Sequence, residues 1–354
     1  MSGSSLDGLD IVYAEFHYLK SRWTYQILCA EVAEFPTHWI NRLQKLSEGD
    51  AKSLWRTHSD FGRYLGEQVN HFIAKNVLFG KVDFIASHGH TIFHFPQNGF
   101  TTQIGDGAAL SQITQLPVVG DFRSADVACG GQGTPIVPIG DHLLFSDYRF
   151  CLNIGGIANI SCKTENGMVA FDICAANQVL NNLANELGKE YDESGVLAKS
   201  GQLNIPLLNQ LNQPAYFNQS YPKSLDNSFS GQTMLPILAA SKISVYDKLR
   251  TYTEHIAFQT GEHINQISQR EKTIFGTHEK ILVTGGGAFN SFLTERIKAS
   301  CNLEVIVPNR EVVKFKEAIV IALMGVLRMR NEVNVLKKVT GASRDTCGGA
   351  VYNG

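Results

Sequence analysis

The pattern of apolar and polar positions divides the first third of the chain into paired strands and one long helix. β-Branched and aromatic residues dominate 11–17 and 24–32, which predicts two strands of a meander. Apolar residues then recur at steps of three and four from Leu54 to Ile73, which predicts an amphipathic helix over 51–76. The same criteria predict further strands at 83–87, 91–95 and 117–120, and a helix near 106–115.

The rest of the chain repeats this arrangement of hairpin strands followed by strand–helix units. The patterns predict strands at 149–154, 157–162, 168–172, 280–284 and 303–307, and helices near 177–187, 234–267, 288–299 and 316–330. Because the theme occurs twice, we expect an α/β protein of two similar lobes with a cleft between them.

The expected boundary falls where a glycine-rich stretch begins, near 120–125. This places an N-terminal lobe at 1–122, completed by a C-terminal segment at about 334–354. The C-terminal lobe then spans 123–333.

Composition excludes several classes of protein. Lys and Arg number 31 against 33 Asp and Glu, so no basic excess exists to neutralise a nucleic acid backbone. The longest apolar runs, such as the one near 319–327, are about half of a membrane span. The seven cysteines are scattered without a C-x-x-C pair, which argues against a disulfide framework or a structural zinc site. With no signal-peptide pattern at the start, we expect a cytoplasmic protein without nucleic acid or membrane partners.

Three glycine turns could hold phosphates. The first lies directly before a strand and comprises Gly3, Ser4, Ser5, Leu6, Asp7, Gly8, Leu9 and Asp10. Its small residues would let backbone N–H groups approach an anion, and Asp7 or Asp10 could reach Mg²⁺ through water. A simple β-turn is the alternative interpretation.

The other two turns, Gly155-Gly156 and Gly285-Gly286-Gly287, follow predicted strands. The last of these opens a predicted helix, which is a common setting for a nucleotide. A hairpin turn and tight strand–helix packing are the respective structural alternatives. Neither turn is a G-x-G-x-x-G fingerprint, so a Rossmann site is disfavoured. Three such turns in two lobes together indicate a nucleotide held at an interlobe cleft.

Candidate residues for chemistry lie between these turns. Asp172 ends a predicted strand just before a helix, so it is either a helix N-cap or a general base. Arg123 and Asp126 precede a flexible glycine-rich stretch, a combination that suits a hydroxylated, anionic ligand or a hinge. His88-Gly89-His90 has the spacing of a metal-ligand pair, but the eightfold βα pattern of a barrel hydrolase is missing. We therefore expect these histidines to form turns or contact substrate, with no metal held by the protein alone.

Taken in order, these segments resemble the anhydro-N-acetylmuramic acid kinase family. The matching motifs are MSGTSLDGxD at Met1 to Asp10, SHGQTI at Ser87 to Ile92, GDFRxxD at Gly120 to Asp126, GGQGxPxVP at Gly130 to Pro138, LNIGGIAN at Leu152 to Asn159, FDxGPGN at Phe171 to Asn177, GGGxxN at Gly285 to Asn290 and VTGAS at Val339 to Ser343. The acidic residue before the family's last long helix matches Glu317. Departures from the family pattern include Ser4, His90 and the segment Cys174 to Ala176.

The resemblance implies a two-lobed actin-like ATPase fold, related to ribonuclease H, with ATP and Mg²⁺ in the interlobe cleft. Gly3–Asp10 and Gly155–Gly156 would lie along the phosphates, and Gly285–Gly287 against the adenosine. Mg²⁺ would be bound mainly through ATP and water. The resemblance also implies a homodimer that acts on 1,6-anhydro-N-acetylmuramic acid in peptidoglycan recycling, giving N-acetylmuramic acid 6-phosphate and ADP.

In this anhydro sugar O6 is bonded to C1, so a water must attack C1 while O6 takes the γ-phosphoryl group. The resemblance makes Asp172 the base for that water, and His88, Arg123, Asp126 and Glu317 the candidates for binding the sugar. The alternative is a catalytically impaired relative that binds a sugar or nucleotide as a sensor. The presence of Asp172 favours the enzyme, because a pure binding protein would not need a base.

Overall fold

The protein divides into two compact units. A computed structural model describes residues 1–3, 6, 8–226, 228–276 and 278–354. The first unit comprises Met1–Leu144 and Phe315–Gly354, and the second comprises Phe145–Lys314. These findings confirm an α/β protein in two parts.

The divisions lie at 144/145 and 314/315 rather than at the expected 122/123 and 333/334. Apolar packing explains the difference. Ile136 and Ile139 share one core cluster with Val119 of the first unit, and Val320 and Leu327 belong to the same cluster.

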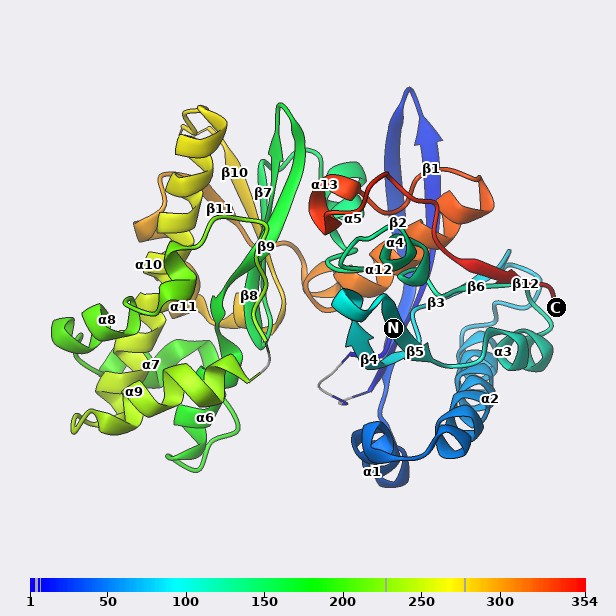
Figure 1. Ribbon diagram of the computed structural model, residues 1–354, viewed down its shortest axis with the longest axis horizontal. Helices are drawn as coiled ribbons and strands as arrows, with labels where there is room; N and C mark the ends of the chain where they lie inside the picture. The colour runs from blue at the N-terminus through cyan, green and yellow to red at the C-terminus, as the bar shows by residue number, and fades with distance from the viewer. Residues whose placement is uncertain (4–5, 7, 227, 277) are drawn as a thin grey trace. The chain divides into compact units, whose positions relative to one another are not determined.

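In the described part of the first unit the strands form three small sheets, and helices lie around them (Figure 1). Its strands are β1 (Leu9–Leu19), β2 (Arg22–Ala33), β3 (Ile85–Ser87), β4 (His90–Phe95), β5 (Phe100–Ile104), β6 (Val118–Gly120) and β12 (Ala350–Tyr352). Its helices are α1 (Thr37–Lys45), α2 (Ala51–Lys75), α3 (Gly107–Thr114), α4 (Ser124–Ala128), α5 (Pro138–Leu143), α13 (Lys337–Thr340) and most of α12 (Arg310–Met329).

Strands β1 and β2 form an antiparallel hairpin, and so do β4 and β5. The third sheet has the order β12-β6-β3, with β3 parallel and β12 antiparallel to β6. The C-terminal strand therefore completes a sheet begun much earlier in the chain.

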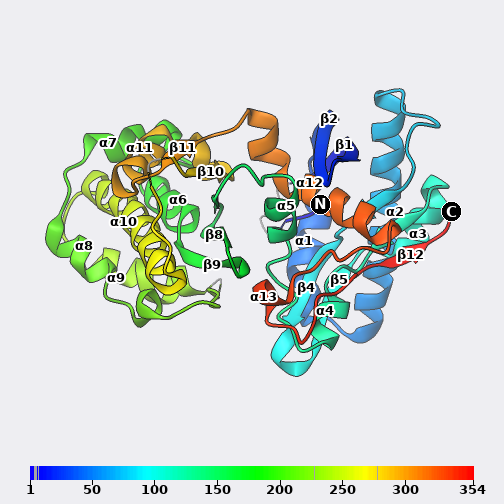
Figure 2. The ribbon, with the colours of Figure 1, turned by 90° about the horizontal axis from the view of Figure 1, so that it is seen from above.

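The second unit is built on one five-stranded sheet of order β11-β10-β7-β8-β9. Its strands are β7 (Phe150–Ile154), β8 (Ile157–Thr164), β9 (Gly167–Ala175), β10 (Lys280–Thr284) and β11 (Glu304–Ile306). Its helices are α6 (Asn177–Asn185), α7 (Val196–Ser200), α8 (Ile205–Leu211), α9 (Leu235–Ala240), α10 (Val245–Glu271) and α11 (Ser291–Ser300). Strand β10 runs parallel to both neighbours, whereas β8 and β9 are antiparallel. The helices gather on one side of this sheet (Figures 1 and 2).

The helix expected over 234–267 is two helices. α9 ends at Ala240, and α10 begins at Val245 after Ser244, whose Oγ accepts a hydrogen bond from the Asp247 N–H at 3.1 Å. A serine N-cap of this kind stabilises a new helix start. No helix in the described part of the chain is long and apolar enough to span a bilayer.

Candidate active site

Asp172 is not a helix cap. Strand β9 continues past it to Ala175, and the N-cap position of α6 is Ala176, which makes no side-chain cap hydrogen bond. The Asp172 Oδ2 instead accepts a hydrogen bond from the Leu225 N–H at 2.9 Å. The N-cap alternative is therefore wrong, because the carboxylate serves a loop distant in sequence.

A β-bulge sets the direction of this side chain. Ala158 pairs with Cys174 and Asn159 pairs with Asp172, so Ile173 has no partner on β8. A bulge of this kind bends the strand and re-aims neighbouring side chains. Ile173 and Cys174 are fully buried, whereas Asp172 is half-buried.

The environment of Asp172 suits a base. Burial raises the pKa of its carboxyl group above the usual 3.8, and the hydrogen bond from Leu225 only partly opposes this. A base with a raised pKa takes a proton more readily at neutral pH. Among the described residues, the Leu225 N–H is the hydrogen-bond donor to this carboxylate, and it engages Oδ2.

The segment 216–225 is tied to β9 beside Asp172. The Tyr216 hydroxyl donates to the Asp172 carbonyl oxygen at 2.6 Å, and the Asp172 N–H donates to the Lys223 carbonyl at 3.3 Å. The Lys223 ammonium donates to the Tyr216 carbonyl at 3.1 Å, which closes the segment on itself. These contacts fix the Leu225 N–H that holds the carboxylate.

A buried histidine anchors the same segment. His263 Nδ1 lies 2.7 Å from the Gln259 carbonyl, which can only accept, so Nδ1 carries the proton and Nε2 accepts from Lys223 Nζ at 2.8 Å. Burial and the Lys223 charge lower the pKa of His263 to about 4, and burial lowers the pKa of Lys223 to about 8. Neither Lys223 nor His263 was predicted from the sequence to have a role. A signal was present in His255, Gln259 and His263, which recur at steps of four along one helix.

The three glycines of the third turn differ in what surrounds them. Gly285 has a φ of +80°, and a Cβ there would lie 2.7 Å from the Ile154 carbonyl oxygen. A Cβ on Gly287 would lie 2.3 Å from Ile154 Cγ2. On Gly286 it would meet only Asn177 Nδ2, at 3.7 Å. Packing against β7 therefore accounts for Gly285 and Gly287, and only Gly286 is open.

Gly155 and Gly156 form the hairpin turn between β7 and β8, as the structural alternative held. Their carbonyls accept hydrogen bonds from the start of α6, with Ala176 N–H to Gly156 O at 2.8 Å and Asn177 N–H to Gly155 O at 3.1 Å. The turn is thus fixed to the N-terminal end of a helix.

In the first unit, Arg123 is held by His88. Its Nε donates to His88 Nε2 at 3.0 Å, and its Nη1 donates to the Gly133 carbonyl at 2.9 Å. His88 Nδ1 lies 3.1 Å from the Gly89 carbonyl, so the ring is neutral with its proton on Nδ1. Burial and the guanidinium charge hold the pKa of His88 well below its usual value, and burial lowers the pKa of Arg123 to about 10.

Glu317 lies within the electrostatic reach of Arg123. Burial raises the pKa of this carboxyl group, and the positive charges of Lys316 and Arg123 oppose the rise. Glu317 in turn raises the pKa of Arg123 against the effect of burial. The fold thus brings together His88, Arg123 and Glu317, which lie far apart in the sequence.

Asp126 was expected to contact the substrate, but it lies inside the first unit. Its side chain is fully buried, and both carboxylate oxygens accept from the protein. Oδ2 accepts from the Gly133 N–H at 2.8 Å, and Oδ1 accepts from the Thr340 hydroxyl at 2.7 Å. The residue ties the glycine-rich 130–133 segment to the end of α13.

The first glycine turn is described only in part, because Ser4, Ser5 and Asp7 lie outside the described residues. Leu6 and Leu9 belong to the core of the first unit. A Cβ on Gly8 would lie 2.9 Å from the Ala33 carbonyl oxygen, so this glycine is required for packing. Gly3 accepts from the Leu6 N–H at 3.4 Å, and the Asp10 backbone pairs with Met1.

Both histidines of the pair are engaged by neighbouring side chains. His90 Nδ1 lies 3.0 Å from Ser2 Oγ, and His88 is engaged with Arg123. Across the described residues no group of three His, Cys, Asp or Glu side chains could hold a metal ion. The hydrogen-bonded interpretation therefore fits these histidines better than a metal hydrolase.

Comparison with known proteins identifies the family. A family model described as anhydro-N-acetylmuramic acid kinase matches residues 1–354. The chain belongs to this family. A curated anhydro-N-acetylmuramic acid kinase of Shewanella frigidimarina is 32% identical over 368 residues, covering 97% of this chain and 94% of that protein. The protein of the same name from Zymomonas mobilis is 32% identical over 380 residues, covering 99% and 98%.

Family membership makes this chain a kinase, and therefore a phosphotransferase. Among solved structures, the activator of the 2-hydroxyisocaproyl-CoA dehydratase from Clostridium difficile with bound ADPNP is a distant neighbour. It has a TM-score of 0.35 and 17% identity, and it covers 62% of this chain and 82% of its own.

Proposed function

We propose that this member of the anhydro-N-acetylmuramic acid kinase family couples two bond changes in one reaction. Water attacks C1 of 1,6-anhydro-N-acetylmuramic acid, and the C1–O6 bond breaks. The electron pair left on O6 forms a bond to the γ-phosphorus of ATP, and the bond to the β-phosphate oxygen breaks. The products are N-acetylmuramic acid 6-phosphate and ADP.

Asp172 is the proposed base, and its environment is the single observation that carries the proposal. One carboxylate oxygen is fixed by the Leu225 N–H, the group is half-buried, and burial raises its pKa. Such a carboxylate can take one proton from the attacking water as the new bond to C1 forms. The Lys223–His263 contact supports this role indirectly, because it holds the segment that positions the carboxylate.

Arg123, His88 and Glu317 are the proposed sugar-binding group. The substrate is an acid, and Arg123 offers a guanidinium whose orientation is fixed by His88 and Gly133. Glu317 could accept hydrogen bonds from sugar hydroxyls near this cation. Asp126, with both oxygens engaged inside the protein, is proposed to position the segment that contacts Arg123 rather than to touch the sugar.

The proposed nucleotide contacts are Gly3–Asp10, Gly155–Gly156 and Gly285–Gly287. Gly286 supports this assignment best, because a Cβ there would meet only Asn177 Nδ2, at 3.7 Å. The proposed Mg²⁺ ion would arrive with ATP and keep several of its waters, and Asp10 or Asp7 would contact it directly or through water. When bound, the ion would neutralise charge on the transferring phosphoryl group.

The test is a phosphoryl-transfer assay with ATP across anhydro-muramic, muramic and glucosamine sugars. We expect ADP and a phosphosugar to form together with the anhydro-muramic sugar, and little turnover with sugars that lack the bridge. Binding of the anhydro sugar and ATP without turnover would support the sensor alternative. Equal turnover of muramic acid would exclude the coupled ring opening.

We also infer a cytoplasmic location, because the reaction consumes ATP. A homodimer is proposed on the family resemblance alone, and light scattering of the purified protein tests it.

A further inference from the structure

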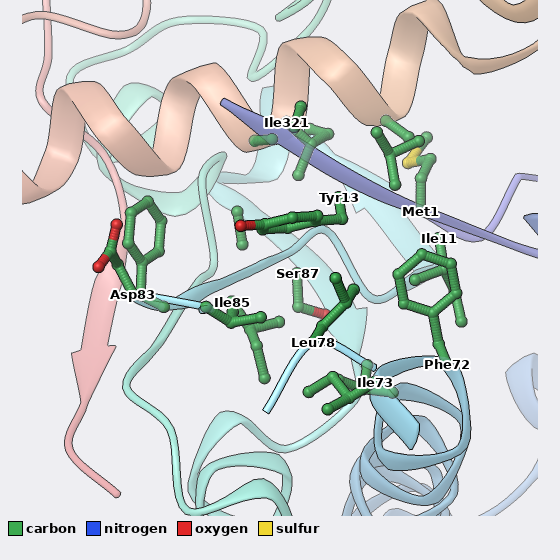
Figure 3. Close-up of a pocket in the computed structure, with 18 of the residues that line it drawn as sticks. Met1, Ile11, Tyr13, Phe72, Ile73, Leu78, Asp83, Ile85, Ser87 and Ile321 are labelled. Carbon is green, nitrogen blue, oxygen red and sulfur yellow. The ribbon is translucent and has the colours of Figure 1, made fainter. Parts of the chain in front are cut away.

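Helix α12 carries a buried lysine directly before its long apolar stretch. Lys316 is only 4% exposed, and positions 318–327 contain no charged residue. Most of that stretch belongs to the core of the first unit. Ile321 lies there among other apolar side chains, which line a cavity of about 480 Å³ (Figure 3). A charge in such surroundings is costly unless it is paired, so Lys316 requires a partner of opposite charge.

The partner of Lys316 is Asp141 of α5. The Lys316 Nζ lies 2.7 Å from the Asp141 Oδ1, and both side chains are buried. The two helices are in close contact at this point, because a Cβ on Gly140 would overlap Val320 Cγ2. Val320 comes four positions after Lys316 and therefore lies on the same face of α12. The ion pair thus lies where α5 packs against α12.

Stability is a weak explanation for a buried ion pair. Removing two charges from water costs about as much free energy as their attraction returns. A well-packed apolar pair of similar volume in the same place is often equally stable or more stable. The Lys316–Asp141 pair therefore points to a role other than holding the two helices together.

The charge of Lys316 acts on its neighbour Glu317, which is one of the groups proposed to bind the sugar. Among the described residues, the positive charges that act on Glu317 are those of Lys316, Arg123 and the Met1 amino group, with Lys316 the strongest. Each of them opposes the rise that burial causes in the pKa of this carboxyl group. His88, which orients Arg123, is a neutral ring and adds no charge.

We propose that Lys316 and Asp141 are positioning residues for Glu317, which together keep this carboxylate ionised and directed toward the sugar. The inference rests on the proposed function, because that function assigns Glu317 to the sugar hydroxyls. Asp141 fixes the Lys316 ammonium on one face of α12. Successive residues of a helix point about 100° apart, so fixing Lys316 also fixes the direction of Glu317.

The test replaces both members of the pair, because removing one would leave a buried charge without its partner and destabilise the fold. Asp141→Leu with Lys316→Met gives an apolar pair, and Asp141→Asn with Lys316→Gln gives a neutral polar pair. We expect both double variants to fold, with the Tm of the apolar one equal to or above that of the wild type. The matched control is Arg42→Met with Asp60→Leu, which removes a 2.8 Å ion pair elsewhere in the first unit.

The main measurement is the pKa of Glu317, followed by ¹³C NMR of labelled carboxyl groups and assigned with Glu317→Gln. We expect this pKa to rise by about one or more in both double variants and to keep its wild-type value in the control. At pH values below it, KM for the anhydro sugar should be about tenfold higher than in the wild type, because one pKa unit changes the ionised fraction about tenfold. The difference should vanish at alkaline pH, and KM for ATP should not change.

An unchanged Glu317 pKa in the double variants would overturn the proposal, whatever happens to Tm, because the pair would then serve packing alone. A rise of the same size in the control would overturn it as well. The NMR measurement uses neither ATP nor sugar, so its result does not depend on the kinase assay. Wild-type turnover of the anhydro sugar together with an unchanged Glu317 pKa would contradict this inference and leave the proposed function intact.

Discussion

Asp126 and Asp172 are both buried or half-buried carboxylates in segments that match family motifs, yet they are held very differently. The two oxygens of Asp126 accept from Gly133 and Thr340, and the side chain is fully buried. Among the described residues, Asp172 accepts a hydrogen bond from Leu225 at Oδ2, and its half-buried carboxyl group has a raised pKa. The comparison suggests a criterion: a motif carboxylate with both oxygens engaged by protein donors supports the fold, whereas one engaged at a single oxygen keeps the other for a ligand, as we propose for Asp172.

The largest expected effect separates these two residues directly. Asp172→Asn keeps an oxygen for the Leu225 N–H but loses the base, so turnover should fall by ~10²–10⁴ while ATP and sugar still bind. Steady-state kinetics and calorimetry on the same preparation check this. A variant with near-normal turnover and a lower Tm would make Asp172 a structural residue like Asp126.

Gly285 and Gly286 of the turn at 285–287 also differ, because one is closely packed and the other is not. Gly285→Ala would place a Cβ 2.7 Å from the Ile154 carbonyl oxygen at a φ of +80°, so we expect a loss of ~3 kcal/mol or more in the stability of the second unit. The matched control is Gly286→Ala, whose Cβ would make only an ordinary contact with Asn177 Nδ2, at 3.7 Å. It should keep the Tm but weaken ATP binding. If Gly286→Ala binds ATP normally, this turn does not contact the nucleotide.

A pH titration tests how the segment beside Asp172 is anchored. The pKa of His263 is lowered to about 4 in the folded protein and is about 6.5 in the unfolded chain. The contribution of the neutral imidazole to the free energy of unfolding is therefore complete above pH 6.5. As pH falls from 6.5 to 4 the unfolded chain binds more protons, and up to ~3 kcal/mol of stability is lost. Tm measured across this range should fall.

His263→Gln removes this titration and should flatten the dependence of Tm on pH. An equally steep fall in the variant would assign the pH dependence to other groups. Activity corrected for the folded fraction should separately be lost as pH falls through the Asp172 pKa, which lies above the ordinary 3.8.

The smallest effect is expected at Asp126. Asp126→Asn turns an amide group toward one of two buried donors, which costs about 1–3 kcal/mol. Tm should fall by about 2–4 °C per kcal/mol, with kcat per folded molecule within a few-fold of wild type. Thr340→Val leaves a buried carboxylate oxygen without its hydroxyl donor and should cost a similar amount of stability. A large loss of kcat in Asp126→Asn without a change in Tm would return Asp126 to the sugar site.

Most of the fold could be predicted from periodicity, because long apolar patterns fix long elements. The strand at Lys280–Thr284 and the helix α2 follow directly from such patterns. The short strand β12 could not be predicted, because Ala350–Tyr352 is a strand only through pairing with β6, which lies far away in sequence. Likewise the boundary between the units depends on packing across distant segments.

The candidate site could be predicted residue by residue only where a motif marks it. The resemblance singled out Asp172 and Arg123, but it could not distinguish Asp126 from them, because the partners Gly133 and Thr340 meet Asp126 only in the fold. His263 carried no motif, and its role depends on a contact with Lys223 across 40 positions of the chain.

The most direct test of the central claim is the position of the oxygen taken from water. In ¹⁸O-labelled water the enzyme should produce N-acetylmuramic acid 6-phosphate that carries the label at C1, with unlabelled phosphate oxygens, because O6 itself attacks the phosphorus. Unlabelled product incubated in the same water corrects for exchange at C1. Label in the phosphate group, or no label at C1 beyond that exchange, would contradict a ring opening by water coupled to phosphoryl transfer.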